Sequence, residues 1–440
     1  MKTNLRKIIL SALFVAVLSS YASAQAPRFI VRETLGSEVL GLVCDLLGCK
    51  VTASLGDPQG QLFAVSGPLG STLNFASSLL GALGVVSVEQ DLAVTLTQSA
   101  SQSGVPSGLY DTTPVNYYGS MVWQGYVNQP AAQIINVSGT QSSFNLAGTG
   151  AVVAVIDTGV DPSHPMLASV VIPGYDFTRN QAGIPDERND VSNNGTTAAV
   201  LESNGSPVVI NGTTAAVLDG TTAAVLEGVQ YQAFGHGTIV AGVVHLVAPQ
   251  AKIMPLKAFQ ANGTANLSDI IRAVYFAVGH KANVIHMSFS FTSYSHEMHS
   301  ALQYAGLLGC VSVASAGNNG EKIVVYPAGY TDVVMGVAST SNTDQLSSFS
   351  NYGSQVVWVA APGEWVVSAY PYDTYAAASG TSFSAPMVSG AAALMANLHS
   401  VNEGQAASAT AHAKFINSNL GHGRLDLFQA LQAWAAAFKL

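Results

Sequence analysis

The chain has 440 residues, of which 48% are hydrophobic and only 9% are charged. Such a chain can bury a large core and form more than one domain. With 16 Lys and Arg against 25 Asp and Glu, it has no basic surplus to neutralise a run of phosphates, so we expect no nucleic-acid partner.

The first 24 residues have the layout of a signal peptide. Three basic residues precede the apolar run IILSALFVAVL, and Ala-Ser-Ala at positions 22–24 supplies the small residues of a cleavage site. The apolar run is shorter than the roughly 20 residues that a membrane-spanning helix needs. We therefore expect cleavage after Ala24, a secreted mature protein and no membrane contact after signal removal.

Residues 25–96 predict a small α+β domain. RFIVRE, KVTASL, QLFAVSG and VVSVEQ have strand patterns, whereas SEVLGLVCDLL and STLNFASSLLGAL have apolar residues at helical spacing. Cys44 and Cys49 are close enough in sequence to form a disulfide in an oxidising compartment. Cys310 lies in an apolar run and is expected to be a buried, inert thiol.

Residues 97–119 predict an exposed, cleavable linker. They begin with TQSASQSGVPSG, which is rich in Ser, Gln, Gly and Pro and has no apolar period. Such a segment cannot bury enough surface to order itself.

Residues 120–440 predict an α/β domain. The apolar runs GAVVAVID, AKIMPLKAF, NVIHMSF, GCVSVASAG and DVVMGVAS alternate with helix-like stretches such as LSDIIRAVYFAVGH. Strands that are hydrophobic on both faces imply a parallel sheet between two layers of helices. An insertion at about 190–228 interrupts this pattern with three copies of TTAAVL. Its repeats are too brief for a solenoid, so we expect a surface insertion whose copies can pair as short strands.

Three segments supply the groups that a hydroxyl needs to hydrolyse a peptide: a nucleophile, an imidazole and a carboxylate. Asp157 closes the strand-like run AVVAVI, at the edge of the sheet where α/β proteins collect their sites. His236 lies between two glycines in FGHGTIVAG, and Ser382 in SGTSFSAPMVSG opens a helix whose first N–H groups favour an anion. Taken singly, each residue has an ordinary explanation as a turn or cap residue.

Two further residues belong to these segments. Asn318 in VASAGNNG follows a strand, and its amide could donate to an oxyanion, although alone it would be an ordinary turn residue. Pro386 follows Ser382, and we expect it in the first turn of the helix, where a missing N–H has no intrahelical acceptor to leave unpaired.

In this order, AVIDTGVD, GHGTIVAG, SAGNNG and GTSFSAP resemble the motifs of the subtilase family. The resemblance covers about residues 120–400, and residues 28–96 resemble the family's inhibitory propeptide more weakly. It implies a subtilisin-like three-layer α/β domain in a secreted serine endopeptidase that is made as a self-processing zymogen. It also implies that Ser382 is the nucleophile and His236 the general base. Asp157 would fix the imidazole tautomer, and Asn318 with the Ser382 N–H would bind the oxyanion.

The same resemblance implies two strands that hold an extended substrate between them, NVIHMSFS and the one within KAFQANGTA. His286 and Ser290 stand where the family usually has Asn and Gly, and Val325 stands where a glycine often forms the floor of a specificity pocket. We therefore expect a shallow pocket that prefers modest apolar side chains. The expected substrate-binding residues are Ser288, Phe289, Ser290, Gly263, Thr264, Ala265 and Val325.

No cofactor is expected. Structural calcium remains open but has no identified site, because Met166 stands where many relatives carry an aspartate ligand. The expected partners are polypeptide substrates and the chain's own propeptide, with the mature protein a monomer. One alternative is a sedolisin-like acid peptidase, against which the histidine of GHGTIVAG argues. Another is a catalytically inactive exported binding protein on a subtilisin scaffold, against which the four filled positions argue.

Overall fold

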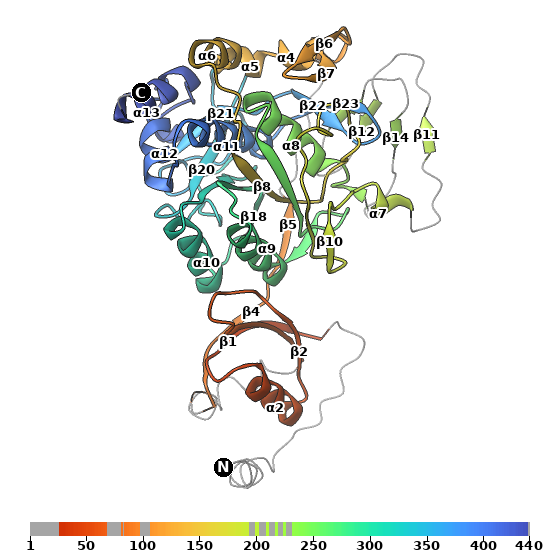
Figure 1. The fold of residues 1–440 in the computed structure, drawn as a ribbon, viewed down its shortest axis with the longest axis vertical. Helices are drawn as coiled ribbons and strands as arrows, with labels where there is room; N and C mark the ends of the chain where they lie inside the picture. Colours follow the sequence, from red (N-terminus) through yellow and green to blue (C-terminus); the bar gives the residue numbers. More distant parts are fainter. Residues whose placement is uncertain are drawn as a thin grey trace.

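The computed structural model describes residues 26–67, 81, 83–96, 106–192, 199–201, 208–210, 216–218, 223–225 and 231–438. The signal peptide predicted over residues 1–24 and almost all of the helix predicted over residues 71–83 lie outside these ranges. The described residues form a small N-terminal unit and a larger body, which lie one below the other in Figure 1.

The N-terminal unit is a four-stranded antiparallel sheet with one described helix packed on it. Its elements are β1 (Arg28–Glu33), α2 (Ser37–Leu47), β2 (Lys50–Ser54), β3 (Leu62–Ser66) and β4 (Val85–Gln90). The strands lie in the order β2-β3-β1-β4. Helix α2 ends at Gly48, which adopts a φ of 75°, and a Cys44–Cys49 disulfide follows. The four predicted strands, the helix over Ser37–Leu47 and the disulfide are confirmed.

The body is built on a sheet of eight strands. In spatial order these are β10 (Gln181–Gly183), β9 (Gly174–Asp176), β15 (Lys252–Lys257), β8 (Val152–Asp157), β17 (Val284–Met287), β19 (Val311–Ser315), β20 (Met335–Thr340) and β21 (Val359–Pro362). All neighbouring strands are parallel except β10 and β9. This confirms the predicted α/β class with a mainly parallel sheet.

Helices cover both faces of this sheet (Figure 1). Along β8, Val153 and Val155 join the hydrophobic cluster that contains α8 (His236–Val247) and α11 (Thr381–Leu398). Ala154 and Ile156 point the other way and join the cluster that contains α9 (Leu267–Gly279) and α10 (His296–Leu307). The remaining helices are α4 (Gln124–Val127), α5 (Pro130–Ile134), α6 (Val137–Phe144), α7 (Asn189–Ser192), α12 (Glu403–Thr410) and α13 (Leu427–Phe438), with 3-10 turns at Ser107–Leu109 and Ser418–Leu420.

Residues 106–119, which the sequence assigns to the linker, instead fold as part of the body. Strand β6 (Pro114–Tyr117) pairs with β7 (Ser120–Trp123). Leu109 and Tyr117 are buried in the same cluster as α8 and α11, and the Tyr117 hydroxyl donates to Leu246 O (2.5 Å). Burial of Leu109 and Tyr117 therefore packs this segment against the body, although its overall composition predicted a linker. Residues 97–105 of the predicted linker lie outside the described part of the chain.

The insertion forms short strands from all three TTAAVL copies. They are β11 (Ala199–Leu201), β13 (Ala216–Leu218) and β14 (Ala223–Val225), and β12 (Val208–Ile210) lies between the first two copies in sequence. Strand β11 pairs with β14, so the predicted pairing of copies is confirmed. Strand β13 pairs with β12 and with β23 (Thr374–Ala378), which also pairs with β22 (Val366–Tyr370). One copy thus adds to the hairpin that leads into α11.

The N-terminal unit meets the body through apolar residues such as Ile30 and Leu62, which lie in the cluster of α9 and α10, and through acidic and basic side chains. Arg32 of β1 donates to both carboxylate oxygens of Glu297 on α10, from Nε (3.2 Å) and Nη2 (2.5 Å). Glu89 accepts the backbone N–H of His296 (2.8 Å), and Asp91 accepts the N–H of Ser268 (2.8 Å). Each of these two carboxylates therefore lies at a helix N-terminus of the body, where free N–H groups favour negative charge.

Candidate active site

Asp157 and His236 meet at the carboxyl edge of the sheet. Asp157 is the last residue of β8 and His236 the first of α8, and both side chains are fully buried. His236 Nδ1 lies 2.8 Å from Asp157 Oδ1 and 2.9 Å from Oδ2. A carboxylate can only accept, so Nδ1 carries the proton and the lone pair of the imidazole is on Nε2. A Cβ on Gly237 would lie 2.0 Å from Gly159 O, which explains the glycine after the histidine.

Ser382 lies in the first turn of α11, directly after Thr381. Its side chain is almost fully buried, and its Oγ donates to Ser288 O (3.4 Å). Among the described residues, His236 Nε2 has no hydrogen-bond partner. The Ser–His hydrogen bond is therefore not formed in this structure, as is common before substrate binds, and Ser382 Oγ must leave Ser288 to form it.

Asn318 lies beside the same turn of α11. Its Oδ1 accepts from the N–H (2.9 Å) and the hydroxyl (2.8 Å) of Thr381. These two bonds fix the amide so that Nδ2 lies next to Gly380, where a Cβ would come within 3.0 Å of it. The four residues that the sequence singled out for catalysis are thus brought together by the ends of β8 and β19 and the starts of α8 and α11.

Pro386 does not lie in the first turn of α11, so that expectation was wrong. It is the sixth residue of the helix, and its missing N–H leaves Ser382 O without the usual i→i−4 donor. The hydroxyl of Ser288 donates to this carbonyl instead (2.8 Å). Ser288 therefore replaces the hydrogen bond that proline removes.

His286 is fully buried and is linked through Ser288 to the main chain of Ser382. Its Nε2 lies 2.7 Å from Ser288 Oγ, and its Nδ1 lies 2.9 Å from Ser389 Oγ on α11. Burial lowers the pKa of His286 to about 3, so the imidazole is neutral at ordinary pH. The sequence marked this position as unusual but gave it no function.

Glu187 is a buried acid behind the Asp–His pair that sequence reasoning missed. It accepts from the N–H of Gly235 (2.9 Å) and from the hydroxyl of Thr238, on either side of His236. The hydroxyl of Thr158 lies 3.0 Å from Glu187 Oε2 and 3.2 Å from Asp157 Oδ1. Burial raises the pKa of Glu187 to about 8, against the opposing effect of its hydrogen bonds. The insertion separates Glu187 from GHGTIVAG in sequence and hid the connection.

The predicted substrate strands flank a segment of the chain itself. Strand β5 (Ala93–Leu96) lies between β16 (Thr264–Asn266) and β18 (Phe289–Ser290), antiparallel to both. The N–H of Leu96 donates to Gly263 O (2.8 Å). In Figure 1, β5 rises from the N-terminal unit into the body beside α9. Six of the seven predicted substrate-binding residues, all except Val325, therefore lie on or beside the two strands that hold an extended peptide.

Val325 is buried next to the loop that carries Asn318. A Cβ on Gly317 would lie 3.5 Å from Val325 Cγ2. The residue after Val325, Tyr326, pairs with Phe291 just beyond β18. Val325 therefore lies between the loop that carries Asn318 and the residues just beyond β18, and the shallow pocket with modest apolar preference stays a prediction.

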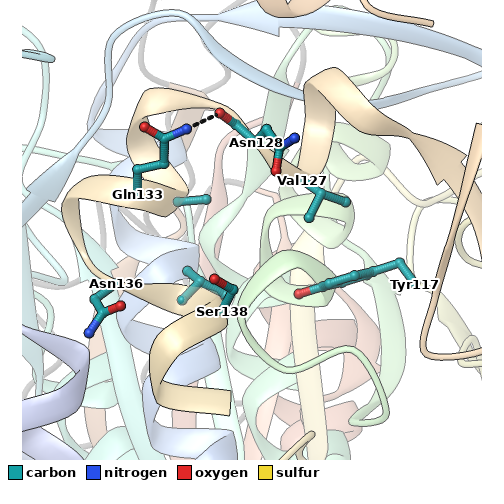
Figure 2. A pocket seen from close by; sticks show the side chains of 8 residues that line it. Tyr117, Val127, Asn128, Gln133, Asn136 and Ser138 are labelled. Carbon is teal, nitrogen blue, oxygen red and sulfur yellow. Dashed lines mark hydrogen bonds between the residues drawn. The ribbon is translucent and has the colours of Figure 1, made fainter. Parts of the chain in front are cut away.

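A cavity of about 240 Å³ lies elsewhere, among β6 and helices α4 to α6 (Figure 2). Figure 2 shows Tyr117, Asn128, Gln133 and Asn136 around it, with Gln133 donating to Asn128 O. None of the catalytic candidates lines this cavity. Within the described ranges there is no cluster of three or more His, Cys, Asp or Glu that could hold a metal ion. The described helices also include none with the length and apolar character to cross a bilayer.

Residues 148–426 match the model of the subtilase family. The chain belongs to this family. The subtilase is 35% identical to thermitase of Thermoactinomyces vulgaris over 250 residues, which are 57% of this chain and 76% of thermitase. It is 36% identical to the thermophilic serine proteinase of Bacillus sp. (strain AK1) over 249 residues, 57% of this chain and 53% of that protein. The subtilase is thus a serine endopeptidase whose substrates are polypeptides.

A solved structure supports the fold of the subtilase. Fervidolysin from Fervidobacterium pennivorans, described as a keratinolytic enzyme related to subtilisin, superposes with a TM-score of 0.65 at 22% identity. The match covers 94% of this chain and 62% of fervidolysin, so the subtilase spans less than two thirds of that protein. The match therefore extends beyond the family domain and includes most of the N-terminal unit.

Proposed function

We propose that this subtilase is a secreted endopeptidase made as a zymogen, in which Ser382, His236 and Asp157 form the catalytic triad. The observation that carries the proposal is the imidazole of His236. One of its nitrogens is held by both oxygens of Asp157, and the other has no partner among the described residues. The imidazole ring lies 5.5 Å, between ring centroids, from Phe383, the residue after Ser382. A buried imidazole with a fixed tautomer and an available lone pair is what a general base requires.

In the reaction, Ser382 Oγ attacks the carbonyl carbon of the scissile bond and gives its proton to His236 Nε2. The negative charge of Asp157 stabilises the imidazolium that forms. The oxyanion receives hydrogen bonds from Asn318 Nδ2 and from the Ser382 N–H, a first-turn amide of α11 without an intrahelical acceptor. His236 then returns the proton to the leaving amine, and water hydrolyses the acyl-enzyme by the same steps in reverse.

Residues 25–96 serve as an inhibitory propeptide in this proposal. Strand β5 occupies the groove between β16 and β18, so a substrate cannot enter while β5 is in place. Because residues 106–119 pack as part of the body, we place the processing site within residues 97–105, a narrower range than the sequence alone suggested. Secretion rests on the predicted signal peptide. The names of relatives include both an intracellular and an extracellular protease, so the family alone does not decide it.

The test is expression of the wild-type chain and Ser382→Ala side by side. Wild type should be labelled by a serine-directed fluorophosphonate, cleave casein and yield a new N-terminus within residues 98–106. Ser382→Ala should lack the label and accumulate with residues 25–105 attached. A Ser382→Ala chain that matures normally without other proteases present would contradict self-processing, and an unlabelled, inactive wild type would contradict the triad.

A further inference from the structure

His286, Ser288 and Ser389 form a hydrogen-bonded series that ends on the main chain of the nucleophile. The series starts at Ser389 Oγ on α11, passes through both nitrogens of His286 on β17, and reaches Ser382 O through Ser288 Oγ. His286, Ser288, Ser389 and Ser382 are each at most 1% exposed. Bulk solvent therefore does not compete for these hydrogen bonds.

The direction of every hydrogen bond in this series follows from the acceptor at its end. A carbonyl oxygen can only accept, so the single hydroxyl proton of Ser288 points at Ser382 O. Ser288 Oγ must then accept from His286, so Nε2 carries the imidazole proton. Because the imidazole is neutral, Nδ1 has a lone pair and accepts from the hydroxyl of Ser389. The tautomer of His286 is thus opposite to that of His236.

We propose that His286 is a positioning residue for the nucleophile, an inference that rests on the proposed triad and adds to it. Its Nε2–H holds the Ser288 hydroxyl in the one orientation that supplies the hydrogen bond missing at Pro386. Its Nδ1 attaches the same imidazole to α11 two turns further along, at Ser389. His286 therefore joins the central sheet to the helix at two points.

This arrangement acts on catalysis because the first turn of α11 carries two reacting groups. One is Ser382 Oγ, and the other is the Ser382 N–H that faces the oxyanion. Pro386 weakens this turn because it cannot donate the i→i−4 hydrogen bond to Ser382 O. The position of the turn therefore depends on the Ser288 hydroxyl. A misplacement of about 1 Å in such groups can cost up to about 100-fold in rate.

The test compares two replacements of similar size that differ in one donor. His286→Gln keeps an N–H near the position of Nε2, whereas His286→Leu keeps only volume. Both full-length variants are expressed beside wild type, and kcat, KM and the rate of fluorophosphonate labelling are measured per processed molecule. We expect His286→Leu to lower kcat and the labelling rate about tenfold, with KM changed less than about twofold. His286→Gln should recover most of the loss.

His245 provides a matched control. It is another fully buried histidine of the body, its Nδ1 lies 3.1 Å from the Tyr126 hydroxyl, and burial likewise lowers its pKa to about 3. His245→Leu should lower the melting temperature but leave the labelling rate of folded enzyme within about twofold of wild type. An equal loss of labelling in His245→Leu and His286→Leu would overturn the proposal, because any buried cavity or unpaired group would then act alike.

Ser288→Ala tests the same connection from its other end. It should slow labelling about as much as His286→Leu does. The double variant with His286→Leu and Ser288→Ala should be labelled little more slowly than either single variant, because the effects of residues that act in series do not add. Ser288→Ala also tests the proposed connection if His286→Leu does not fold. Suppose that wild type is labelled. If Ser288→Ala is then labelled at the wild-type rate, or if His286→Leu and His286→Gln are labelled at equal rates, only the role of His286 is overturned and the triad stands. Absence of labelling in wild type would instead overturn the triad.

Discussion

The body and the N-terminal unit differ in how each of them is stabilised. The body has a large apolar cluster on each face of its sheet, and α8 is buried over its whole length. The N-terminal unit has one small described cluster, and it leaves Leu35, Leu42, Leu46 and Val86 exposed. Small domains bury a smaller fraction of their surface and are less stable for that reason. The body therefore depends on its own core, and the unit depends on what it contacts.

What the unit contacts is both apolar and polar. Ile30, Leu55, Leu62 and Ala64 lie in the same hydrophobic cluster as α9 and α10. Arg32 meets Glu297, and Glu89 and Asp91 meet the first turns of α10 and α9. The unit therefore combines apolar contact with ion pairs and helix caps, and the polar part is specific to the docked arrangement. The Ser382→Ala chain keeps both regions in one polypeptide, so the stability of each can be measured in the same molecule.

The largest expected effect is a pH dependence that belongs to the body. Burial raises the pKa of Glu403 and of Glu187 to about 8, from about 4.5 in the unfolded chain. Between these values the folded body binds the extra protons, so its free energy of unfolding falls as pH rises from about 4.5 to about 8. Each group contributes up to about 1.4 kcal/mol per pH unit. Denaturant unfolding at pH 5, 6.5 and 8 measures the slope.

Glu403→Gln isolates one of these two contributions. The amide keeps the size of the side chain, whose carboxylate accepts the N–H of Ser312 (2.6 Å), but it cannot ionise. The slope of the free energy of unfolding against pH should fall by about half, because the contribution of Glu187 remains. Exposed Glu321→Gln is the control and should leave the slope unchanged. A body that becomes more stable over the same pH range would show that Glu403 is ionised in the fold.

The next effect concerns the contact between the two regions. Arg32→Leu leaves Glu297 buried with its carboxylate unpaired except for the Ser87 hydroxyl. Because one partner of a largely buried ion pair is lost, the free energy that holds the unit on the body should fall by about 3 kcal/mol. Hydrogen exchange of β1 to β4 measures this opening. Exposed Lys50→Ala should not change it, and equal exchange in the two variants would contradict the importance of this ion pair.

Within the body, the sequence predicted some segments better than others. The strands of the body were predictable because VVAVI is apolar at every position and VIHM at all but His286. The catalytic candidates could be selected because glycines and chain order mark their segments. Tyr117 was assigned to a linker because the run before it is rich in Ser, Gln, Gly and Pro, and its distant contact with Leu246 explains why it instead packs in the body.

Two site residues were missed for reasons of distance. Glu187 contacts Gly235 and Thr238 across sequence separations of 48 and 51 residues, and no local pattern reports such contacts. His286 was visible as an unusual residue, but its function depends on Ser389, more than a hundred residues away, and on the position of Pro386 in a helix whose start the sequence did not fix.

A smaller effect is expected from the Cys44–Cys49 disulfide of the N-terminal unit. It closes a loop with a sequence separation of only 5 residues. Short loops restrict the unfolded chain little, and the chain-entropy estimate for such a loop is about 2 kcal/mol. The Cys44→Ser, Cys49→Ser double variant should speed hydrogen exchange of α2 and β2 accordingly, while exchange of α8 in the body stays the same. Faster exchange in α8 as well would mean that the two regions unfold together.

The smallest effect is expected from Glu89, which caps α10 from outside the body. Its carboxylate accepts from the N–H groups of His296 and Glu297 and from the Ser295 hydroxyl. Ser295 Oγ also caps the helix itself by accepting from Met298 N, so α10 keeps one cap when Glu89 is replaced. Glu89→Ala should therefore weaken the hold of the unit by only about 1 kcal/mol. In the active chain, this variant should release its cleaved unit faster without changing kcat of the freed body. A lower kcat would mean that α10 needs the unit after folding, and that the body is less independent than its two large cores indicate.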